Sequence, residues 1–273
     1  MTNPFINGTH IMGIVNVTPD SFSDGGQFNN TDRAVSHSLE LIEQGADIID
    51  IGGESTRPGA ETVSVDEELS RVLPVIEKLA GKTKWISIDT RHADVMDAAL
   101  SAGATMINDV SALEDDPRSL SIAAKYDCPI CLMHKKGMPD RMQQNPSYND
   151  VVREVYDYLQ SRIDACVNAG ISKDRLIVDV GIGFGKNLDH NLALIKNISK
   201  FHDLNVPILM GASRKSFIEK IMNENTPAAE RIGGSLATAM WGLQCNVQMF
   251  RVHDVAQTVQ AIKIYQSIAS ASL

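Results

Sequence analysis

The sequence predicts a (β/α)8 barrel. Three observations predict it: short apolar runs that recur along the whole chain, a polar or glycine-rich stretch directly after each run, and helical patterns between them. A short β-branched run that is bounded by turn residues and followed by a helix is typical of a parallel strand in a βα unit. Eight such units close into a barrel of roughly 250 residues, with its chemistry in the loops after the strands. We therefore expect residues 1–273 to form one barrel domain.

The predicted strands share this apolar composition and are spread evenly along the chain. They are residues 11–15, 48–51, 85–88, 106–107, 129–133, 176–178, 207–210 and 247–250. Between strands, Val35, Leu39 and Ile42 form an apolar stripe with helical spacing. A similar stripe over residues 255–262 predicts the last helix, with Asp254 as its N-cap. The pattern over 148–170 predicts the longest helix, which should end at Gly170.

The composition narrows the possible locations and partners. No stretch approaches the roughly 18 apolar residues of a membrane span, and the first residues lack a basic segment followed by an apolar one. We therefore expect a cytoplasmic protein. The formal net charge of −9 argues against broad binding to nucleic acid or to anionic membranes. An anionic substrate would need a locally basic pocket.

The four cysteines do not resemble a disulfide framework in so long a chain. Cys128 and Cys131 match the C-x-x-C spacing of redox proteins. They flank and enter a predicted strand, however, where residues three apart point to opposite faces. We interpret both as reduced structural residues.

Polar residues at the ends of different strands indicate a binding site. Asp89, Asn108 and Asp179 end three predicted strands, and Lys215 follows a fourth. A charged carboxylate near a barrel core is costly unless it has hydrogen-bond donors, so several together favour a polar ligand with matching N–H groups. A single aspartate in this place is more often the N-cap of the next helix. The combination therefore favours the site.

A glycine-rich stretch follows Asp179. Residues 179–186 (DVGIGFGK) fit neither the dinucleotide-binding pattern nor the phosphate-loop pattern. The glycines could let the backbone pass close to a flat ligand, with Phe184 as a stacking or wall residue. The alternative is a plain tight turn.

A basic and amide cluster is expected at the barrel mouth. Arg251 and His253 share one side of the last strand, and Asn16 ends the adjacent first strand. Arginine and histidine donors suit a phosphate group, and Asn16 could supply one oxygen to a Mg²⁺ that travels with a diphosphate. A strand end that binds water is the competing interpretation. His134 is interpreted as structural.

Three connections are longer than a bare βα turn requires, at residues 18–28, 52–62 and 135–148. Long polar loops in a compact domain are often lids or binding loops. The alternative is a solvated connector, and for residues 135–148 the two interpretations are evenly balanced.

Seven motifs in chain order resemble those of the dihydropteroate synthase family. They are residues 16–26 (NVTPDSFSDGG), 53–59 (GESTRPG), 89–91 (DTR), 108–109 (ND), 181–186 (GIGFGK), 213–216 (SRKS) and 251–254 (RVHD). The resemblance extends from the first strand to the last helix. It implies a (β/α)8 barrel of folate synthesis that joins 4-aminobenzoate to 6-hydroxymethyl-7,8-dihydropterin diphosphate, is a sulfonamide target and forms a homodimer.

The resemblance also implies roles for individual residues. The pterin pocket would be lined by Asp89, Asn108, Asp179 and Lys215. The diphosphate and Mg²⁺ would be held by Asn16, Arg251 and His253, with Asn16 as the metal ligand. The 4-aminobenzoate would be surrounded by Thr56, Pro58, Phe184, Lys215 and Ser216. Two mobile loops would contribute Phe22 and Arg57. Catalysis would depend on Asp89, Asp179, Lys215, Arg251 and His253.

Three residues, at two places in the chain, depart from the family pattern. Val180 stands where the family usually has proline, and Lys135 and Lys136 stand where Met-Gln is usual. We interpret Val180 as a tolerated backbone change. The two lysines leave open which contacts the connection 135–148 makes at the site, although extra positive charge there would suit an anionic substrate.

Two other functions share part of this pattern. A pterin-binding methyltransferase barrel would keep the carboxylate and amide residues but would not need a diphosphate cluster. The motif 251–253 (RVH), together with 213–215 (SRK), therefore argues against it. A non-catalytic pterin-binding paralogue is disfavoured because both loop motifs are intact. Product formation from the two substrates separates the three possibilities.

Overall fold

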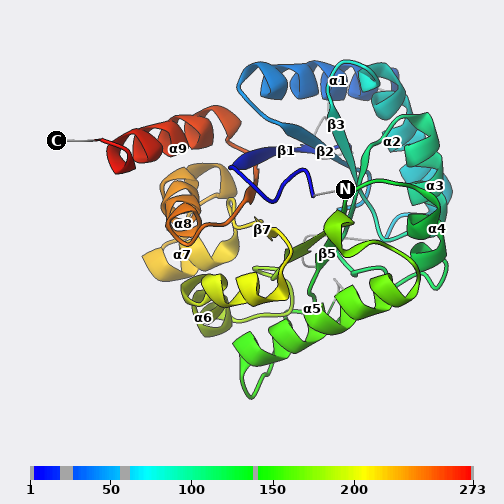
Figure 1. Ribbon diagram of the computed structural model, residues 1–273. Helices are drawn as coiled ribbons and strands as arrows, with labels where there is room; N and C mark the ends of the chain where they lie inside the picture. Colours follow the sequence, from blue (N-terminus) through cyan, green and yellow to red (C-terminus); the bar gives the residue numbers. More distant parts are fainter. Residues whose placement is uncertain (1–2, 19–26, 56–61, 138–140, 272–273) are drawn as a thin grey trace.

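The computed structural model describes residues 3–18, 27–55, 62–137 and 141–271. Eight parallel strands pair in chain order, and the last pairs with the first, so that the sheet closes into a barrel (Figure 1). The strands are β1 (His10–Asn16), β2 (Ile48–Gly52), β3 (Trp85–Asp89), β4 (Met106–Asp109), β5 (Ile130–Met133), β6 (Leu176–Asp179), β7 (Ile208–Met210) and β8 (Met249–Val252). Each overlaps one of the predicted apolar runs, and the predicted (β/α)8 barrel is confirmed.

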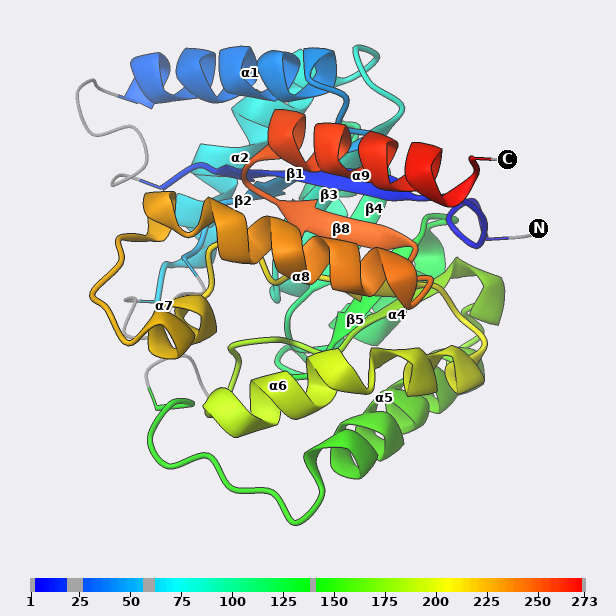
Figure 2. The same ribbon diagram turned by 90° about the vertical axis from the view of Figure 1, so that its left-hand side faces the viewer.

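The helices form a ring around the barrel. They are α1 (Gln27–Glu43), α2 (Val65–Leu79), α3 (Ala93–Ala102), α4 (Ser119–Lys125), α5 (Val151–Asn168), α6 (Leu188–Lys196), α7 (Ser216–Met222), α8 (Ile232–Gln244) and α9 (Val255–Ala269). Figure 2 shows α1, α9, α8, α6 and α5 in succession across one side of the barrel. Short 3₁₀ turns occupy Lys173–Arg175, Ile198–Leu204 and Ala228–Glu230. None of the helices in the described ranges is long and apolar enough to span a membrane.

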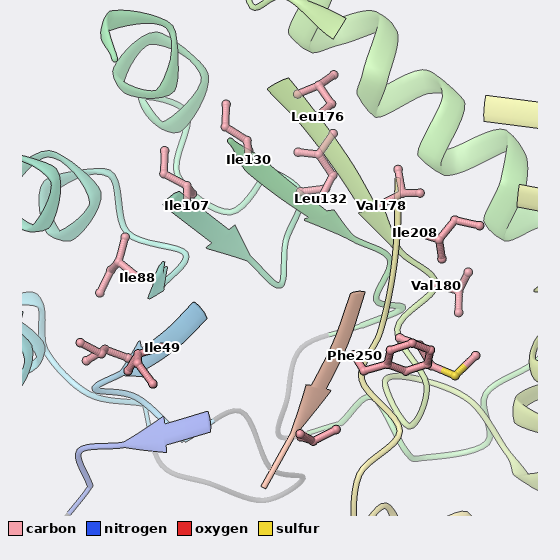
Figure 3. Close-up of a cluster of buried hydrophobic side chains, with 14 of the residues drawn as sticks. Ile49, Ile88, Ile107, Ile130, Leu132, Leu176, Val178, Val180, Ile208 and Phe250 are labelled. Atoms are coloured by element: carbon pink, nitrogen blue, oxygen red, sulfur yellow. The ribbon is translucent and has the colours of Figure 1, made fainter. Parts of the chain in front are cut away.

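A continuous apolar layer separates the barrel from the helices. Ile49, Ile88, Ile107 and Ile130 point outward from four neighbouring strands and are fully buried (Figure 3). Burying a side chain of this size contributes about 1.5–3 kcal/mol relative to leaving it exposed. Val180 is part of the same layer and has no exposed surface, which explains why valine is acceptable at this position (Figure 3).

The helix predictions are confirmed with one correction. The stripe of Val35, Leu39 and Ile42 packs against the apolar layer. Gly170 follows the end of α5 with a φ of 87°, a conformation that favours glycine. Asp254 lies directly before α9 as expected, but its side chain makes no capping hydrogen bond. It accepts instead from Nε of Arg214 at 3.0 Å, because a charged partner is available 40 residues earlier in the chain.

The cysteines are free thiols, as predicted. Cys128 belongs to the layer between barrel and helices, whereas Cys131 lies inside the barrel. The opposite placement follows from the alternation of side chains along a strand. Burial raises the pKa of both thiols. Both cysteines therefore behave as structural residues.

Inward-facing side chains fill the barrel in layers. The lower, amino-terminal part holds four apolar residues from the even-numbered strands: Ile48, Met106, Ile177 and Met249. Two residues further along these strands, the inward positions are occupied by Asp50, Asn108, Asp179 and Arg251. Four residues from alternate strands form one layer of such a barrel. The lower layer closes the barrel, and the upper layer forms the floor of the site.

Candidate functional site

A pocket opens at the carboxyl ends of the strands. Six residues predicted from the sequence line it: Asp89, Asn108, Asp179, Phe184, Lys215 and Arg251. Val110, Met133 and Gly211 complete the lining. Four of the predicted residues come from the ends of strands and two, Phe184 and Lys215, from the connections that follow β6 and β7, and the barrel brings them together.

Arg251 is held between two carboxylates in this pocket. Its Nε donates to Asp50 and its Nη2 donates to Asp89, each at 2.6 Å. Burial disfavours the charged guanidinium, but the two carboxylates raise the pKa of Arg251 above its ordinary value. Burial raises the pKa of Asp89 to about 7, and Arg251 acts in the opposite direction. The arginine therefore neutralises acidic charge inside the barrel as well as facing the pocket.

Asp179 presents one carboxylate oxygen to its own loop. Its Oδ1 accepts from the backbone N–H of Gly181 at 2.8 Å. Burial raises the pKa of this carboxyl, whereas the Gly181 hydrogen bond and the charge of Lys215 lower it. The Oδ2 atom lies on the side of Gly211, another pocket residue. One oxygen thus fixes the side chain, which leaves Oδ2 as the acceptor for a ligand.

Phe184 and Lys215 form one wall of the pocket. The Lys215 ammonium lies 4.1 Å from the centre of the Phe184 ring, a cation–π arrangement. Gly183 faces the methylene groups of Lys215, and a Cβ there would lie 3.3 Å from Cδ. Ser216 is exposed at the start of α7. The predicted wall role of Phe184 agrees with this geometry.

The other glycines of this loop approach the neighbouring loop. A Cβ on Gly181 would lie 1.9 Å from the carbonyl oxygen of His134, and one on Gly185 would lie 2.2 Å from that of Lys136. Both have positive φ, 67° and 66°. The close approach that we predicted toward a ligand is, for these two glycines, an approach to the protein's own backbone. Loop packing therefore explains them.

Lys186 is buried within this loop, which the sequence did not predict. It is 1% exposed, and its Nζ lies 2.9 Å from Nδ1 of His134, 2.9 Å from the carbonyl oxygen of Gly181 and 3.0 Å from that of Phe184. Burial lowers the pKa of Lys186 to about 7. The amine joins the loop after β6 to the loop after β5. His134 is a partner in this packing, in agreement with its predicted structural role.

His253 lies beside the end of β7. Its Nδ1 is 3.0 Å from Oγ of Ser213, which also accepts from the His253 backbone N–H at 3.2 Å. Burial and the nearby Arg251 charge lower the pKa of His253 to about 3. The imidazole is therefore neutral near pH 7. Asn16 ends β1, the strand that pairs with β8, so the three predicted residues lie at neighbouring strand ends.

A series of ion pairs crosses the rim of the barrel. Arg91 donates to Glu54 from Nε at 2.9 Å and lies 3.5 Å from Asp115, which in turn pairs with Lys135. The carboxylate of Glu54 also accepts from the backbone N–H of Val63 at 3.3 Å. These pairs connect the loops after β2, β3, β4 and β5. None of the four residues was singled out for this role by its position in the sequence.

The two lysines that depart from the family pattern have partners within the protein. Lys135 pairs with Asp115, and the Lys136 ammonium lies 4.1 Å from the centre of the Tyr148 ring. Lys136 also donates to the carbonyl oxygen of Ser147 at 2.6 Å. The expected extra positive charge is thus taken up by local contacts. Four predicted residues, Phe22, Thr56, Arg57 and Pro58, lie outside the described residues.

Comparison with known proteins agrees with this geometry. The sequence profile of a family described as "Pterin binding enzyme" matches residues 12–253, which includes every described residue of the pocket. The chain therefore belongs to the pterin-binding enzymes.

Several relatives within that family are dihydropteroate synthases. The dihydropteroate synthase of Escherichia coli K12 is 48% identical over 263 residues, which cover 96% of this chain and 92% of that one. A Xanthomonas albilineans dihydropteroate synthase solved with 4-aminobenzoic acid superposes with a TM-score of 0.91 at 46% identity, covering 97% and 95% of the two chains. A structure of that enzyme in complex with 7,8-dihydropteroate gives a TM-score of 0.88 at 43% identity, with the same coverage. The chain belongs to the dihydropteroate synthases, a family of transferases.

Asp50 is the most important residue that sequence reasoning missed. It is fully buried and contacts two of the predicted pocket residues, Asn108 and Arg251. A signal was available: Asp50 is a charged residue inside an apolar strand, two positions after Ile48, so both must face the same side. Asp50 lies within an apolar run, whereas the predicted site residues follow the ends of such runs.

Proposed function

We propose that this pocket binds the pterin ring of 6-hydroxymethyl-7,8-dihydropterin diphosphate and that the chain joins it to 4-aminobenzoate. The observation that carries the assignment is the set of buried carboxylate and amide groups at the barrel mouth, beside Lys215. A pterin edge offers adjacent N–H groups and a carbonyl. Asp179 accepts from the N–H groups, Asn108 adds a further acceptor, and Lys215 donates to the carbonyl.

The reaction exchanges one bond for another. The amine nitrogen of 4-aminobenzoate forms a bond to the pterin methylene carbon, the bond from that carbon to the diphosphate oxygen breaks, and the amine gives up a proton. Positive charge develops on the methylene and the ring. Asp89 and Asp179 stabilise this charge from fixed positions, so the catalysis is mainly electrostatic preorganisation and needs no protein nucleophile.

The leaving diphosphate meets Arg251 and His253. Because the pKa of His253 is lowered to about 3, the histidine contributes a neutral N–H donor rather than a charge. Arg251 supplies the positive charge, part of which is already balanced by Asp50 and Asp89. This balance favours release of the diphosphate product after the reaction.

Mg²⁺ is the cofactor that the donor chemistry supports. Among the residues that the structure describes, no group of three or more His, Cys, Asp or Glu side chains could hold a metal ion. Mg²⁺ often takes only one or two protein oxygens and keeps water and phosphate oxygens as its other ligands. Asn16, half-buried at the end of β1, suits such a site. When bound, the ion takes up negative charge on the leaving group.

The 4-aminobenzoate subsite combines a described wall with loop residues. Phe184, Lys215 and Ser216 supply the wall, and Thr56 and Pro58 are assigned to it from the resemblance. Phe22 and Arg57 are assigned to loops that close over the site and exclude water. If these loops settle around a bound diphosphate, 4-aminobenzoate alone meets an incomplete pocket and must itself meet the cost of ordering it.

Titration calorimetry tests this order of binding. We expect 4-aminobenzoate, and sulfonamides that mimic it, to bind detectably only in the presence of pterin diphosphate, or of diphosphate with Mg²⁺ and the free pterin. Equal affinity for 4-aminobenzoate with and without diphosphate would exclude the loop-ordering mechanism. Formation of 7,8-dihydropteroate from the two substrates tests the activity itself.

Two substitutions test the diphosphate cluster. Arg251→Ala and His253→Ala should weaken pterin diphosphate much more than a pterin that lacks the diphosphate, because each removes a donor to phosphate oxygen. His253→Ala is the cleaner change, since Arg251→Ala also leaves Asp50 and Asp89 without their shared partner. Equal losses for both ligands would assign the cluster a structural role.

We also propose a cytoplasmic homodimer built from single-domain subunits. Exposed apolar side chains on neighbouring helices support an interface: Ile221 and Met222 end α7, and Trp241 lies on α8 with 43% exposure. The two helices pack closely, since a Cβ on Gly234 of α8 would meet Ile218 of α7. Sedimentation equilibrium of the wild type and of Trp241→Lys tests the interface, and a monomeric wild type would contradict it.

A further inference from the structure

Asp50 lies below the pocket and contacts two residues that line it. Its side chain is fully buried, and it is not itself part of the pocket lining. Its carboxylate accepts from Nδ2 of Asn108, at 3.1 Å to Oδ2 and 3.3 Å to Oδ1. The same Oδ2 accepts from Nε of Arg251 at 2.6 Å. One carboxylate on β2 therefore connects a residue of β4 to a residue of β8.

The contact with Asn108 fixes which end of the amide faces a ligand. A carboxamide has a donor end and an acceptor end, and a carboxylate can only accept. Since the Asn108 nitrogen donates to Asp50, the amide oxygen Oδ1 is the atom that remains for the pocket. Asn108 is thereby defined as an acceptor for a ligand N–H group, as Asp179 is.

The contact with Arg251 fixes the plane of its guanidinium. Nε is held by Asp50 and Nη2 by Asp89, so two carboxylates on neighbouring strands hold the planar group at two points. A long side chain held in this way loses little further conformational freedom when a ligand binds. The orientation of Arg251 is therefore set by the protein's own carboxylates.

We propose that Asp50 is a positioning residue, which sets the acceptor direction of Asn108 and the plane of Arg251 without touching substrate. This inference rests on the proposed assignment of the pocket to a pterin. It also explains which pocket atoms donate hydrogen bonds to a ligand and which accept them. Asp50 makes Asn108 an acceptor toward the ligand, and it makes Arg251 a fixed donor.

The substitution Asp50→Asn removes the negative charge of residue 50 and turns one of its acceptors into a donor, with almost no change in side-chain volume. An asparagine can accept from Arg251 with its oxygen, but its nitrogen then needs an acceptor, which the Asn108 oxygen supplies only if that amide turns over. The turned amide presents an N–H group to the N–H groups of the ligand. We expect pterin diphosphate affinity to fall about tenfold to hundredfold, the range for a buried N–H group left without an acceptor.

A double variant separates positioning from general damage. In Asp50→Asn with Asn108→Asp, the nitrogen of residue 50 again has an acceptor at residue 108, and residue 108 again presents an acceptor to the ligand. The double variant should therefore bind pterin diphosphate more tightly than Asp50→Asn alone. Asp109→Asn is the matched control, because Asp109 is equally buried but accepts only from its own loop, at Ser111 and Leu113.

The readouts are pterin diphosphate affinity by calorimetry, thermal stability, and hydrogen exchange of the Arg251 Nε–H by NMR in the protein without ligand. We expect Asp50→Asn to lose affinity and Nε–H protection, and Asp109→Asn to lose stability only. The inference is wrong if both variants lose affinity equally, if the double variant shows no recovery, or if Nε–H protection survives in Asp50→Asn. A wild type that binds no pterin diphosphate would instead contradict the proposed function, and the exchange measurement would still decide whether Asp50 holds Arg251.

Discussion

The lower and upper layers of the barrel interior use the same strands for opposite purposes. Ile177 in the lower layer is surrounded by apolar side chains, whereas Asp179, two residues further along β6, faces the pocket. The same step separates Met249 from Arg251 on β8. Both residues of each pair belong to the same strand. A step of two residues along a strand therefore separates the apolar part that holds the barrel together from the polar part that recognises a ligand.

The two layers also differ in whether their buried side chains need hydrogen-bond or ion-pair partners. The lower layer needs no partners, because burial of apolar surface is itself favourable. In the upper layer each charged group has a specific partner: Arg251 pairs with Asp50 and with the nearby Asp89 of β3, and Asp179 accepts from the Gly181 N–H. Buried charges are strongly destabilising when one partner is removed. The upper layer is therefore the part in which single substitutions have specific effects.

The largest expected loss of stability comes from placing a carboxylate in the lower, apolar layer. Ile177→Asp places a charge among apolar side chains without a donor, and we expect the free energy of unfolding to fall by about 3–5 kcal/mol. Urea denaturation followed by circular dichroism measures the change. The counterpart, Asp179→Ile, should abolish pterin binding but leave a folded barrel. Similar stability losses in both variants would contradict the division into two layers.

Asp179→Asn tests the recognition assigned to the upper layer. The oxygen of the new amide is taken up by the Gly181 N–H, as Oδ1 of the carboxylate is now, so the amide must present its N–H groups to the ligand. We expect pterin binding to weaken by about 1.5–3 kcal/mol. Calorimetry on the folded variant checks this, and unchanged affinity would remove Asp179 from the pterin site.

Lys186 places a buried amine in the loop directly above the upper layer. Burial lowers its pKa to about 7, so between about pH 7 and 10 the unfolded chain holds a proton that the folded protein has released. Unfolding takes up that proton, and raising the pH in this window therefore adds stability. Lys186→Met should remove this gain, up to about 1.4 kcal/mol per pH unit.

Urea denaturation at pH 7, 8 and 9 measures the slope for the wild type and for Lys186→Met. The exposed Lys200→Met serves as the control and should keep the wild-type slope. An identical slope in the wild type and in Lys186→Met would show that the amine keeps its proton in the folded protein.

The smallest effect is expected from a conservative change in the lower layer. Met249→Leu keeps the volume and apolar character of a fully buried side chain, so the free energy of unfolding should change by less than about 1.5 kcal/mol. Pterin affinity should not change, because Met249 does not line the pocket. A loss of affinity in this variant would show that the two layers are coupled.

The sequence was sufficient for the features that depend on local patterns. The apolar runs predicted each strand, and alternation along a strand correctly placed Cys128 and Cys131 on opposite sides. The same alternation would have revealed Asp50, had it been applied within a run as well as at its end. These features depend on periodicity, which the chain carries locally.

Contacts between distant segments could not be predicted in this way. Lys186 meets His134, 52 residues earlier, and Asp254 pairs with Arg214 in place of capping its helix. In both cases a specific partner in the folded protein overrides the local preference. Glycine positions were recognised, but whether Gly181 approaches a ligand or a neighbouring loop depends on packing that only the folded chain defines.

Glu54 separates the stability of the barrel from the length of the loop that follows β2. The residue stands at one end of the stretch 55–62, and its carboxylate accepts from the backbone N–H of Val63 at the other end. Both ends of this segment are therefore anchored by one side chain, which Arg91 holds in turn. Each doubling of loop length costs only about 0.6 kcal/mol of closure entropy. A change of loop length between these two anchors should therefore cost the barrel little stability, whatever it does to binding by Thr56, Arg57 and Pro58.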